Sequence, residues 1–211
     1  MLGLDVATLV ARAIVLLIAF TLHELAHAVT ADYQGDPTPR NMGRITLNPL
    51  KHLDPVGTIM LLISGFGWAK PVRVNPYNMR GNPHTDMAIV ALAGPATNLA
   101  LAGLGSIPFQ LGFAYPAFSG TASLDFLLTQ FVWINLVLAF FNLIPVPPLD
   151  GYRILLGVLP LEMSIKLRPL EQYGFLILIT LIFFLPMMGI DILSTVVWQP
   201  AAAVFQRMVG F

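Results

Sequence analysis

The sequence predicts an all-α polytopic membrane protein with five or six membrane helices, a short re-entrant segment and a small β-hairpin or sheet. Of its 211 residues, 56% are hydrophobic and 10% are charged, and the mean hydropathy is +0.77. Soluble domains carry about 25% charged residues. Several apolar stretches also approach or exceed the roughly 20 residues that cross a bilayer as a helix. We expect residues 1–211 to form a single domain, with a core at about 4–155 and C-terminal helices at about 170–208.

Composition also restricts the function. The formal net charge is zero and the pI is about 6.9, which gives no indication of nucleic-acid binding. The chain has no cysteine, so disulfides, a thiolate nucleophile and cysteine-ligated zinc are excluded. The first apolar segment is longer than a signal-peptide core and has no basic region before it, so we expect it to be retained.

The first membrane helix is expected from about Leu4 to Asp32, and it carries the most informative motif. His23, Glu24 and His27 form a His-Glu-x-x-His pattern inside an apolar segment. Residues four apart lie on one face of a helix, so both imidazoles can bind one metal ion while Glu24 reaches a water molecule beside it. The pattern predicts a zinc hydrolase.

The apolar setting separates this motif from a chance match. An ionisable side chain at the bilayer centre costs roughly 2.5 to 3.5 kcal/mol on insertion scales. Three such side chains within five residues are therefore not expected there without a shared partner. A chance match without metal is the usual explanation in a polar surface helix, but here it leaves that cost unexplained. We therefore favour a shared cation.

The region after this helix is polar and rich in turn-forming residues. Ile45–Thr46 and Pro71–Asn75 are expected to be short strands that pair beside the first helix. Between them, Val56–Trp68 is apolar but only thirteen residues long. Because a spanning helix needs about 20 residues, we expect this stretch to be re-entrant or interfacial.

Further helical stretches follow. The helix expected at Thr85–Leu111 contains Gly94 and Pro95, which should loosen its hydrogen bonding, and Asn98, a polar group that needs a partner within the bundle. Ile190–Phe205 is expected to be either a further kinked span or an interfacial helix. The remaining expected helices are Ser123–Leu143, the short Arg153–Leu161 and Tyr173–Met188.

A catalytic zinc usually has three protein ligands and one open position, so the two histidines need a partner. Glu162 and Glu171 lie in a charged turn, and His52 and His84 lie in polar loops. Asp150 follows three prolines within four positions, a stretch expected to be extended and rigid. Non-helical backbone at membrane depth is tolerated where it is buried in protein or lines a wet cavity. Asp150 is thus the preferred third ligand, and a role as helix N-cap is the alternative.

His52 and Asp54 form a weaker candidate for a second metal site. Two ligands two positions apart in a loop fix no coordination geometry. A turn before the re-entrant segment is the preferred interpretation of these residues.

Three motifs, in this order, resemble the site-2 protease family of intramembrane zinc metalloproteases. The resemblance covers roughly residues 10 to 155. The chain is most similar to compact prokaryotic members of the family. The chain departs from many members, because we expect no PDZ-like insertion, no nucleotide-sensing domain and no membrane helix before the catalytic one. The motifs are His23-Glu24-Leu25-Ala26-His27 in one helix, Gly94-Pro95-Ala96-Thr97-Asn98 in another, and the stretch from Asn142 to Gly151 that closes a third.

The resemblance implies one zinc ion per chain, held by His23, His27 and Asp150. Glu24 would be the general base, and Asn98 would support the site. The residues that would line the route of an unwound substrate are Asn142, Pro145 and Pro147.

The leading hypothesis is an intramembrane zinc endopeptidase that hydrolyses peptide bonds in or near transmembrane segments of membrane proteins. The alternative, from another class, is a non-enzymatic membrane metal-binding protein or transporter, in which Glu24 has no role as a base. The expected partners are a transmembrane protein substrate and the lipid bilayer, without nucleic acid, and the oligomeric state is left open.

The charge distribution predicts an orientation. If Val56–Trp68 does not cross the membrane, the basic residues of segments 40–80 and 153–168 share one side, whereas the loop Phe113–Ala122 carries no charge. Cytosolic loops carry an excess of Lys and Arg. We therefore expect a prokaryotic cell-membrane protein whose active site is accessible from the cytosolic side.

Overall fold

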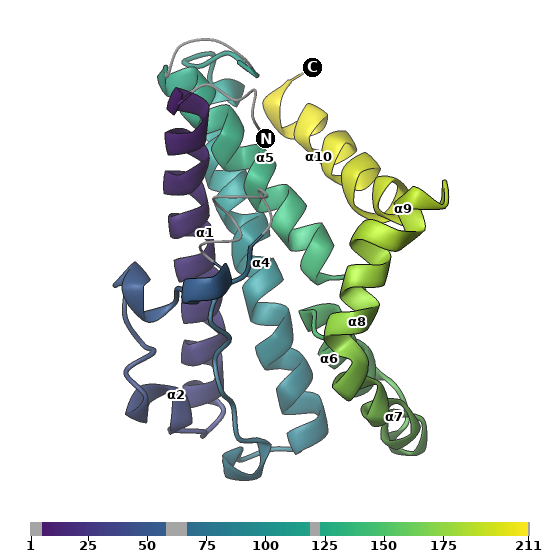
Figure 1. The fold of residues 1–211 in the computed structure, drawn as a ribbon. Coiled ribbons are helices and arrows are strands. Elements are labelled where there is room, and N and C mark those ends of the chain that lie inside the picture. Colours follow the sequence, from purple (N-terminus) through teal and green to yellow (C-terminus); the bar gives the residue numbers. More distant parts are fainter. Residues whose placement is uncertain (1–5, 58–66, 119–122, 211) are drawn as a thin grey trace.

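Three long helices form the centre of the molecule (Figure 1). They are α1 (Val6–Tyr33), α4 (Pro83–Gln110) and α5 (Leu124–Asn142). The computed structural model describes residues 6–57, 67–118 and 123–210. All three helices contain stretches long and apolar enough to cross a membrane, which confirms the helices predicted from these apolar segments.

Polar side chains fix where α4 and α5 begin. Asn82 accepts a hydrogen bond from the His84 N–H at 3.0 Å, and Ser123 accepts one from the Phe126 N–H at 3.1 Å. Such N-caps satisfy backbone donors that have no partner in the first helical turn. These two residues therefore mark the ends of the connections before α4 and α5.

The C-terminal third forms a succession of shorter helices beside the bundle (Figure 1). Two wide π turns lie next to Pro186 and Pro200, and they include the residues four positions earlier, Ile182 and Val196. A proline ring clashes with the carbonyl four residues before it, and a wider turn gives that carbonyl room. The elements are α6 (Asp150–Val158), α7 (Leu161–Leu167), η3 (Arg168–Tyr173), α8 (Gly174–Ile179), η4 (Thr180–Phe184), α9 (Leu185–Met187), η5 (Ser194–Trp198) and α10 (Gln199–Val209).

The number of membrane helices is lower than predicted. Among the described residues, four helical stretches are long and apolar enough to cross a membrane, the fourth being Leu161–Met187. The prediction of five or six was therefore too high. The nine residues of α6 extend only about 14 Å at 1.5 Å per residue, and α10 carries Gln199, Gln206 and Arg207.

The predicted β-hairpin is not confirmed. Ile45–Thr46 and Pro71–Asn75 are irregular, and within residues 6–57, 67–118 and 123–210 the β pairing is one isolated antiparallel bridge between Leu53 and Ala69. Most of the predicted re-entrant segment, Val56–Trp68, falls on residues 58–66, which lie outside the described part of the chain.

Side chains accept hydrogen bonds from backbone N–H groups that would pair with a neighbouring strand in a sheet. The Val72 N–H donates to Glu24 Oε2 at 3.0 Å, and the Asn75 N–H donates to Asp36 Oδ2 at 2.6 Å. Pro71 has no N–H to offer. Buried backbone donors need partners, and here carboxylates from other segments supply them in place of a ladder.

The proline-rich stretch before α6 is a series of turns, not the extended segment predicted. The Val146 N–H donates to the Ile144 carbonyl at 2.8 Å, and the Leu149 N–H donates to the Val146 carbonyl at 3.0 Å. The peptide bond between Pro147 and Pro148 is cis. Val146 and Leu149 are not prolines and keep their N–H donors, and these donors close the turns.

Asp36 fixes the connection that follows α1. Its fully buried carboxylate accepts hydrogen bonds from the Thr38 hydroxyl at 2.6 Å and the Thr38 N–H at 3.0 Å, and it also accepts from Asn75 and Asn78. Burial by itself would raise the pKa of this carboxyl, but the hydrogen bonds from Thr38, Asn78 and Asn75 lower it below its ordinary value. The charged form therefore stabilises the fold.

Replacing Asp36 with Asn should lower the free energy of unfolding by about 2 kcal/mol near neutral pH, because the amide loses hydrogen bonds to a charged acceptor. The folded-state pKa lies below the unfolded one. The stabilisation is therefore fully present above the unfolded pKa of about 3.9 and is lost as the pH falls through the folded pKa. Thermal unfolding of both proteins at pH 7 and pH 3 should show the difference narrowing in acid.

The matched control is Asp191→Asn, at an exposed aspartate that accepts one hydrogen bond from the Ser194 N–H. An equal loss of stability in the Asp36 and Asp191 variants at pH 7 would contradict the role given to Asp36.

Candidate metal centre

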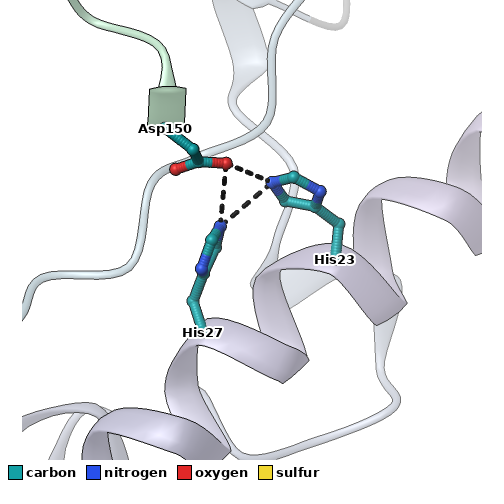
Figure 2. Close-up of side chains that lie close together, drawn as sticks. All are labelled: His23, His27 and Asp150. Atoms are coloured by element: carbon teal, nitrogen blue, oxygen red, sulfur yellow. Dashed lines mark hydrogen bonds and ion pairs between the residues drawn. The ribbon is translucent and has the colours of Figure 1, made fainter. Parts of the chain in front are cut away.

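Two helices bring His23, His27 and Asp150 together (Figure 2). Both histidines lie on α1, and Asp150 is the first residue of α6. Asp150 Oδ2 lies 3.1 Å from His23 Nε2 and 3.3 Å from His27 Nε2, and the two Nε2 atoms are 3.0 Å apart. The histidines are buried, and the Asp150 side chain is 15% exposed. The three residues predicted as ligands thus converge on one point.

Close backbone contact places Asp150 over the histidines. A Cβ atom on Gly151 would lie 2.5 Å from the Ile144 carbonyl oxygen, so only glycine lets the start of α6 fold back against the proline-rich turns. Leu149 precedes the helix with extended backbone, and no side chain caps this end. The carboxylate of Asp150 faces the imidazoles, so the N-cap alternative does not hold.

The site also needs open space on α4. A Cβ atom on Gly94 would lie 2.5 Å from His23 Cε1 and 2.5 Å from His27 Nε2. These separations are far shorter than a van der Waals contact. Gly94 therefore lets α4 pass directly beside the imidazoles.

Hydrogen-bond acceptors on α4 set the tautomer of both imidazole rings. His27 Nδ1 lies 2.7 Å from the Val90 carbonyl, which can only accept, so Nδ1 carries the hydrogen. His23 Nδ1 lies 2.6 Å from Asn98 Oδ1, and the Asn98 amide donates to Asn135 Oδ1 at 2.9 Å. When the imidazoles are neutral, both Nε2 atoms are therefore lone-pair acceptors, and both lie near Asp150 Oδ2.

This arrangement fits a zinc ion. Asp150 Oδ2 is buried and lies at ion-pair distance from both Nε2 atoms, so with neutral imidazoles three lone-pair acceptors face one another. Zinc bonds of about 2.0 to 2.2 Å at tetrahedral angles separate ligand atoms by about 3.3 to 3.6 Å. The observed separations of 3.0, 3.1 and 3.3 Å are close to that range. Two imidazoles and a carboxylate are also a ligand set that zinc prefers.

Glu24 is held beside this centre by one of its two oxygens. Its side chain is buried, and Oε2 accepts a hydrogen bond from the Val72 N–H at 3.0 Å. Arg44 Nη2 lies 3.6 Å from the same oxygen. The general base predicted from the motif is therefore adjacent to the histidines and is fixed by two segments far from α1 in the sequence.

The remaining predicted site residues divide into two groups. Asn98 contacts the site through His23. The Asn142 side chain bonds to the Leu138 carbonyl of its own helix, Pro147 packs near Gly174, and Pro145 is exposed. No hydrogen bond or ion pair among the described residues joins Asn142, Pro145 or Pro147 to His23, His27 or Asp150, so their role along a substrate route stays a prediction.

His52 and Asp54 form hydrogen bonds within the segment from Thr46 to Gly57. His52 is fully buried and donates from Nε2 to the Thr46 carbonyl at 2.9 Å. Asp54 accepts a hydrogen bond from the Gly57 N–H at 2.9 Å. In the part of the chain that the structure describes, the group able to hold a metal is the one formed by His23, His27 and Asp150, which favours the turn interpretation for His52 and Asp54.

Sequence reasoning missed the Val90 carbonyl, Arg44 and Asn135 as contacts of the site. Asn135 did carry a usable signal, because it is an amide in the middle of an apolar span and such groups need partners. A backbone carbonyl and a loop arginine carry no such signal. Their roles follow only from how α4 and the loops pack on α1.

Replacing Gly94 with Ala should abolish tight binding of zinc, because the added methyl would overlap both imidazoles. Gly103→Ala on the same helix is the control, since a Cβ there has nothing within 4 Å. Zinc titration of both purified variants measures the difference. Wild-type affinity in the Gly94 variant would contradict the proposed geometry.

Removing the amide of Asn98 or Asn135 should weaken zinc binding by about 10- to 100-fold, the usual effect of removing a group that orients a histidine ligand. The loss should be larger for Asn98→Ala, which contacts His23 directly, than for Asn135→Ala. Competition against a zinc chelator gives both affinities. A larger loss of zinc affinity in Asn135→Ala than in Asn98→Ala would show that Asn135 does not act through Asn98.

Comparisons with known proteins agree with this centre. The model of peptidase family M50 matches residues 111–187. The Bacillus subtilis (strain 168) protein named "Putative zinc metalloprotease YwhC" is 45% identical over 173 residues, which cover 80% of this chain and 78% of that protein.

Two mycobacterial proteins named "Putative zinc metalloprotease Rip2" also match. The one from Mycolicibacterium smegmatis is 38% identical over 173 residues, covering 79% of this chain and 64% of the relative. The one from Mycobacterium tuberculosis (strain H37Rv) is 34% identical over 192 residues, covering 86% and 70%. No solved structure gives a significant match. The chain therefore belongs to peptidase family M50, the site-2 protease family of zinc metalloproteases.

Proposed function

We propose that this chain is an intramembrane zinc endopeptidase that hydrolyses peptide bonds in or near transmembrane segments of membrane proteins. The observation that carries the proposal is the position of the metal donors. His23 and His27 lie within the membrane-length helix α1, and Asp150 joins them from the start of α6. A hydrolytic centre at that depth suits a substrate that is itself in the membrane.

His23, His27 and Asp150 would hold the zinc ion, which supplies a Lewis acid that lowers the pKa of a bound water and polarises the scissile carbonyl. The hydrogen bonds to Val90 and Asn98 select the neutral tautomer whose Nε2 carries no hydrogen, so both Nε2 atoms can bind the metal. Family membership supports zinc as the metal.

Glu24 is the proton carrier in this proposal. Its carboxylate accepts a proton from the attacking water and delivers it to the nitrogen of the leaving amine, as a general base and then a general acid. One oxygen is held by the Val72 N–H, which limits the rotation of the carboxylate. The group is buried, so bulk water does not compete for the transferred proton.

The proposed active site lies nearer the end of α1 that carries basic loops. His23 is ten residues before the last residue of α1, Tyr33, or about 15 Å at 1.5 Å per residue. Figure 1 places α2 (Thr38–Asn41), the start of α4 and α7 at that same end of the molecule. Arg40 and Lys166 belong to these elements. The positive-inside rule then supports access from the cytosolic side of a prokaryotic cell membrane.

The substrate must expose its backbone to be cut. A transmembrane helix has all of its peptide groups bonded internally, so the segment that reaches Glu24 has to be locally unwound. We infer that the substrate is a transmembrane protein with a segment that unwinds readily, and that the surrounding lipid bilayer is the second partner of the chain.

Replacing Glu24 with Gln should leave zinc binding intact and reduce cleavage of a model transmembrane peptide by at least about 100-fold, because the amide cannot accept the proton. Cleavage by purified protein, with zinc content measured on the same samples, tests this. Glu162→Gln, at an exposed residue of α7, is the matched control. Full activity in the Glu24 variant would rule out the mechanism, and loss of zinc in that variant would mean that Glu24 is needed for the site to form.

A further inference from the structure

Arg44 is a buried cation beside the metal centre. It lies in the loop between α2 and η1 (Pro49–Lys51), and its side chain is only 4% exposed. Its Nη2 atom is 3.6 Å from Glu24 Oε2 and also donates to the Lys70 carbonyl. One guanidinium therefore connects three segments of the chain: the loop after α2, the irregular segment after residue 67, and α1.

Burial of this guanidinium has to be offset by a specific partner, because arginine is rarely buried unless it is paired. Burial lowers the pKa of Arg44, and the negative charge of Glu24 opposes that effect. The Nε atom has no hydrogen-bond partner among the described residues. Arg40 differs from Arg44 in this respect, because its exposed side chain pairs with Asp32.

The contacts on Glu24 are unequally distributed between its two oxygens. Oε2 faces both the Arg44 guanidinium and the Val72 N–H. Within the described residues, no hydrogen bond or ion pair holds Oε1. One hydrogen bond and one ion pair on the same oxygen restrain the carboxylate, and they leave the second oxygen free to exchange a proton.

We propose that Arg44 is a positioning residue for the reaction, which holds Oε2 of Glu24 together with the Val72 N–H so that Oε1 accepts and returns the proton. This inference rests on the proposed function. By also binding the Lys70 carbonyl, Arg44 keeps the backbone at Val72 beside α1, so both contacts on Oε2 depend on the same side chain.

The proposal separates Arg44 from residues that only stabilise the fold. A misplacement of a catalytic group by about 1 Å can cost roughly 100-fold in rate, whereas substrate affinity and metal binding need not change. Loss of Arg44 should therefore lower kcat, with KM and zinc stoichiometry close to wild type. A purely structural role would instead lower zinc content and thermal stability together with the rate.

The test compares Arg44→Met, Arg44→Lys and Arg40→Met in the full-length, zinc-loaded protein, with cleavage of a model transmembrane peptide as the readout. For Arg44→Met we expect kcat to fall by about 100-fold, with KM within a factor of about three and one zinc per chain. Arg44→Lys keeps a cation that can reach Oε2, so its kcat should be about tenfold higher than that of Arg44→Met but should stay below wild type. Arg40→Met, which removes the exposed ion pair with Asp32, should match wild type.

Wild-type kcat in Arg44→Met would overturn the role of Arg44 while leaving the proposed function intact. Failure of Arg44→Lys to recover any rate, with reduced zinc content, would also overturn it in favour of a structural role. If Arg44→Met does not fold, Arg44→Lys decides: a reduced kcat with full zinc and normal thermal stability supports the proposal, and an unchanged kcat overturns it. Absence of cleavage by the zinc-loaded wild-type chain would instead overturn the proposed function, and this inference with it.

Discussion

The structure depends on bringing three lone-pair acceptors into one buried volume. His23 and His27 are adjacent on α1 because they are four residues apart, but Asp150 is more than one hundred residues further along the chain. The three polar atoms lie 3.0 to 3.3 Å from one another. Without a cation or an added proton they would repel, and burial in an apolar environment makes that repulsion stronger. The ion and the fold therefore depend on each other.

The rest of the bundle can be understood as support for this centre. Helix α4 passes close to α1 at Gly94 and supplies the Val90 carbonyl and the Asn98 amide that orient the imidazoles. Helix α5 continues that chain of amides through Asn135. Each link satisfies a polar group that would otherwise be costly inside the membrane. Orientation of the ligands and internal satisfaction of buried polar groups are thus achieved by the same contacts.

Local patterns in the sequence were sufficient for the long helices and for the donor set. The apolar stretches gave α1, α4 and α5 to within a few residues, and the spacing of His23 and His27 indicated their shared face. Asp150 was selected because it is ionisable and follows a run of prolines. These features are visible because each depends on residues near one another in the chain.

What the sequence did not reveal depends on contacts between distant segments. The segment Pro71–Asn75 has the composition of a strand, but carboxylates of Glu24 and Asp36 occupy its backbone donors. The cation of Arg44 looks like any loop arginine until the fold buries it beside Glu24. The turns before α6 depend on the N–H donors of Val146 and Leu149. None of these contacts can be predicted from a short stretch of sequence.

Zinc X-ray absorption spectroscopy tests the shared cation most directly. The account predicts one zinc per chain, bound by two imidazole nitrogens and a carboxylate oxygen at about 2.0 to 2.2 Å. In an Asp150→Ala variant, the carboxylate contribution should disappear and the zinc content should fall. The same zinc content and the same coordination shell in that variant would contradict the account, because Asp150 would then not be a ligand.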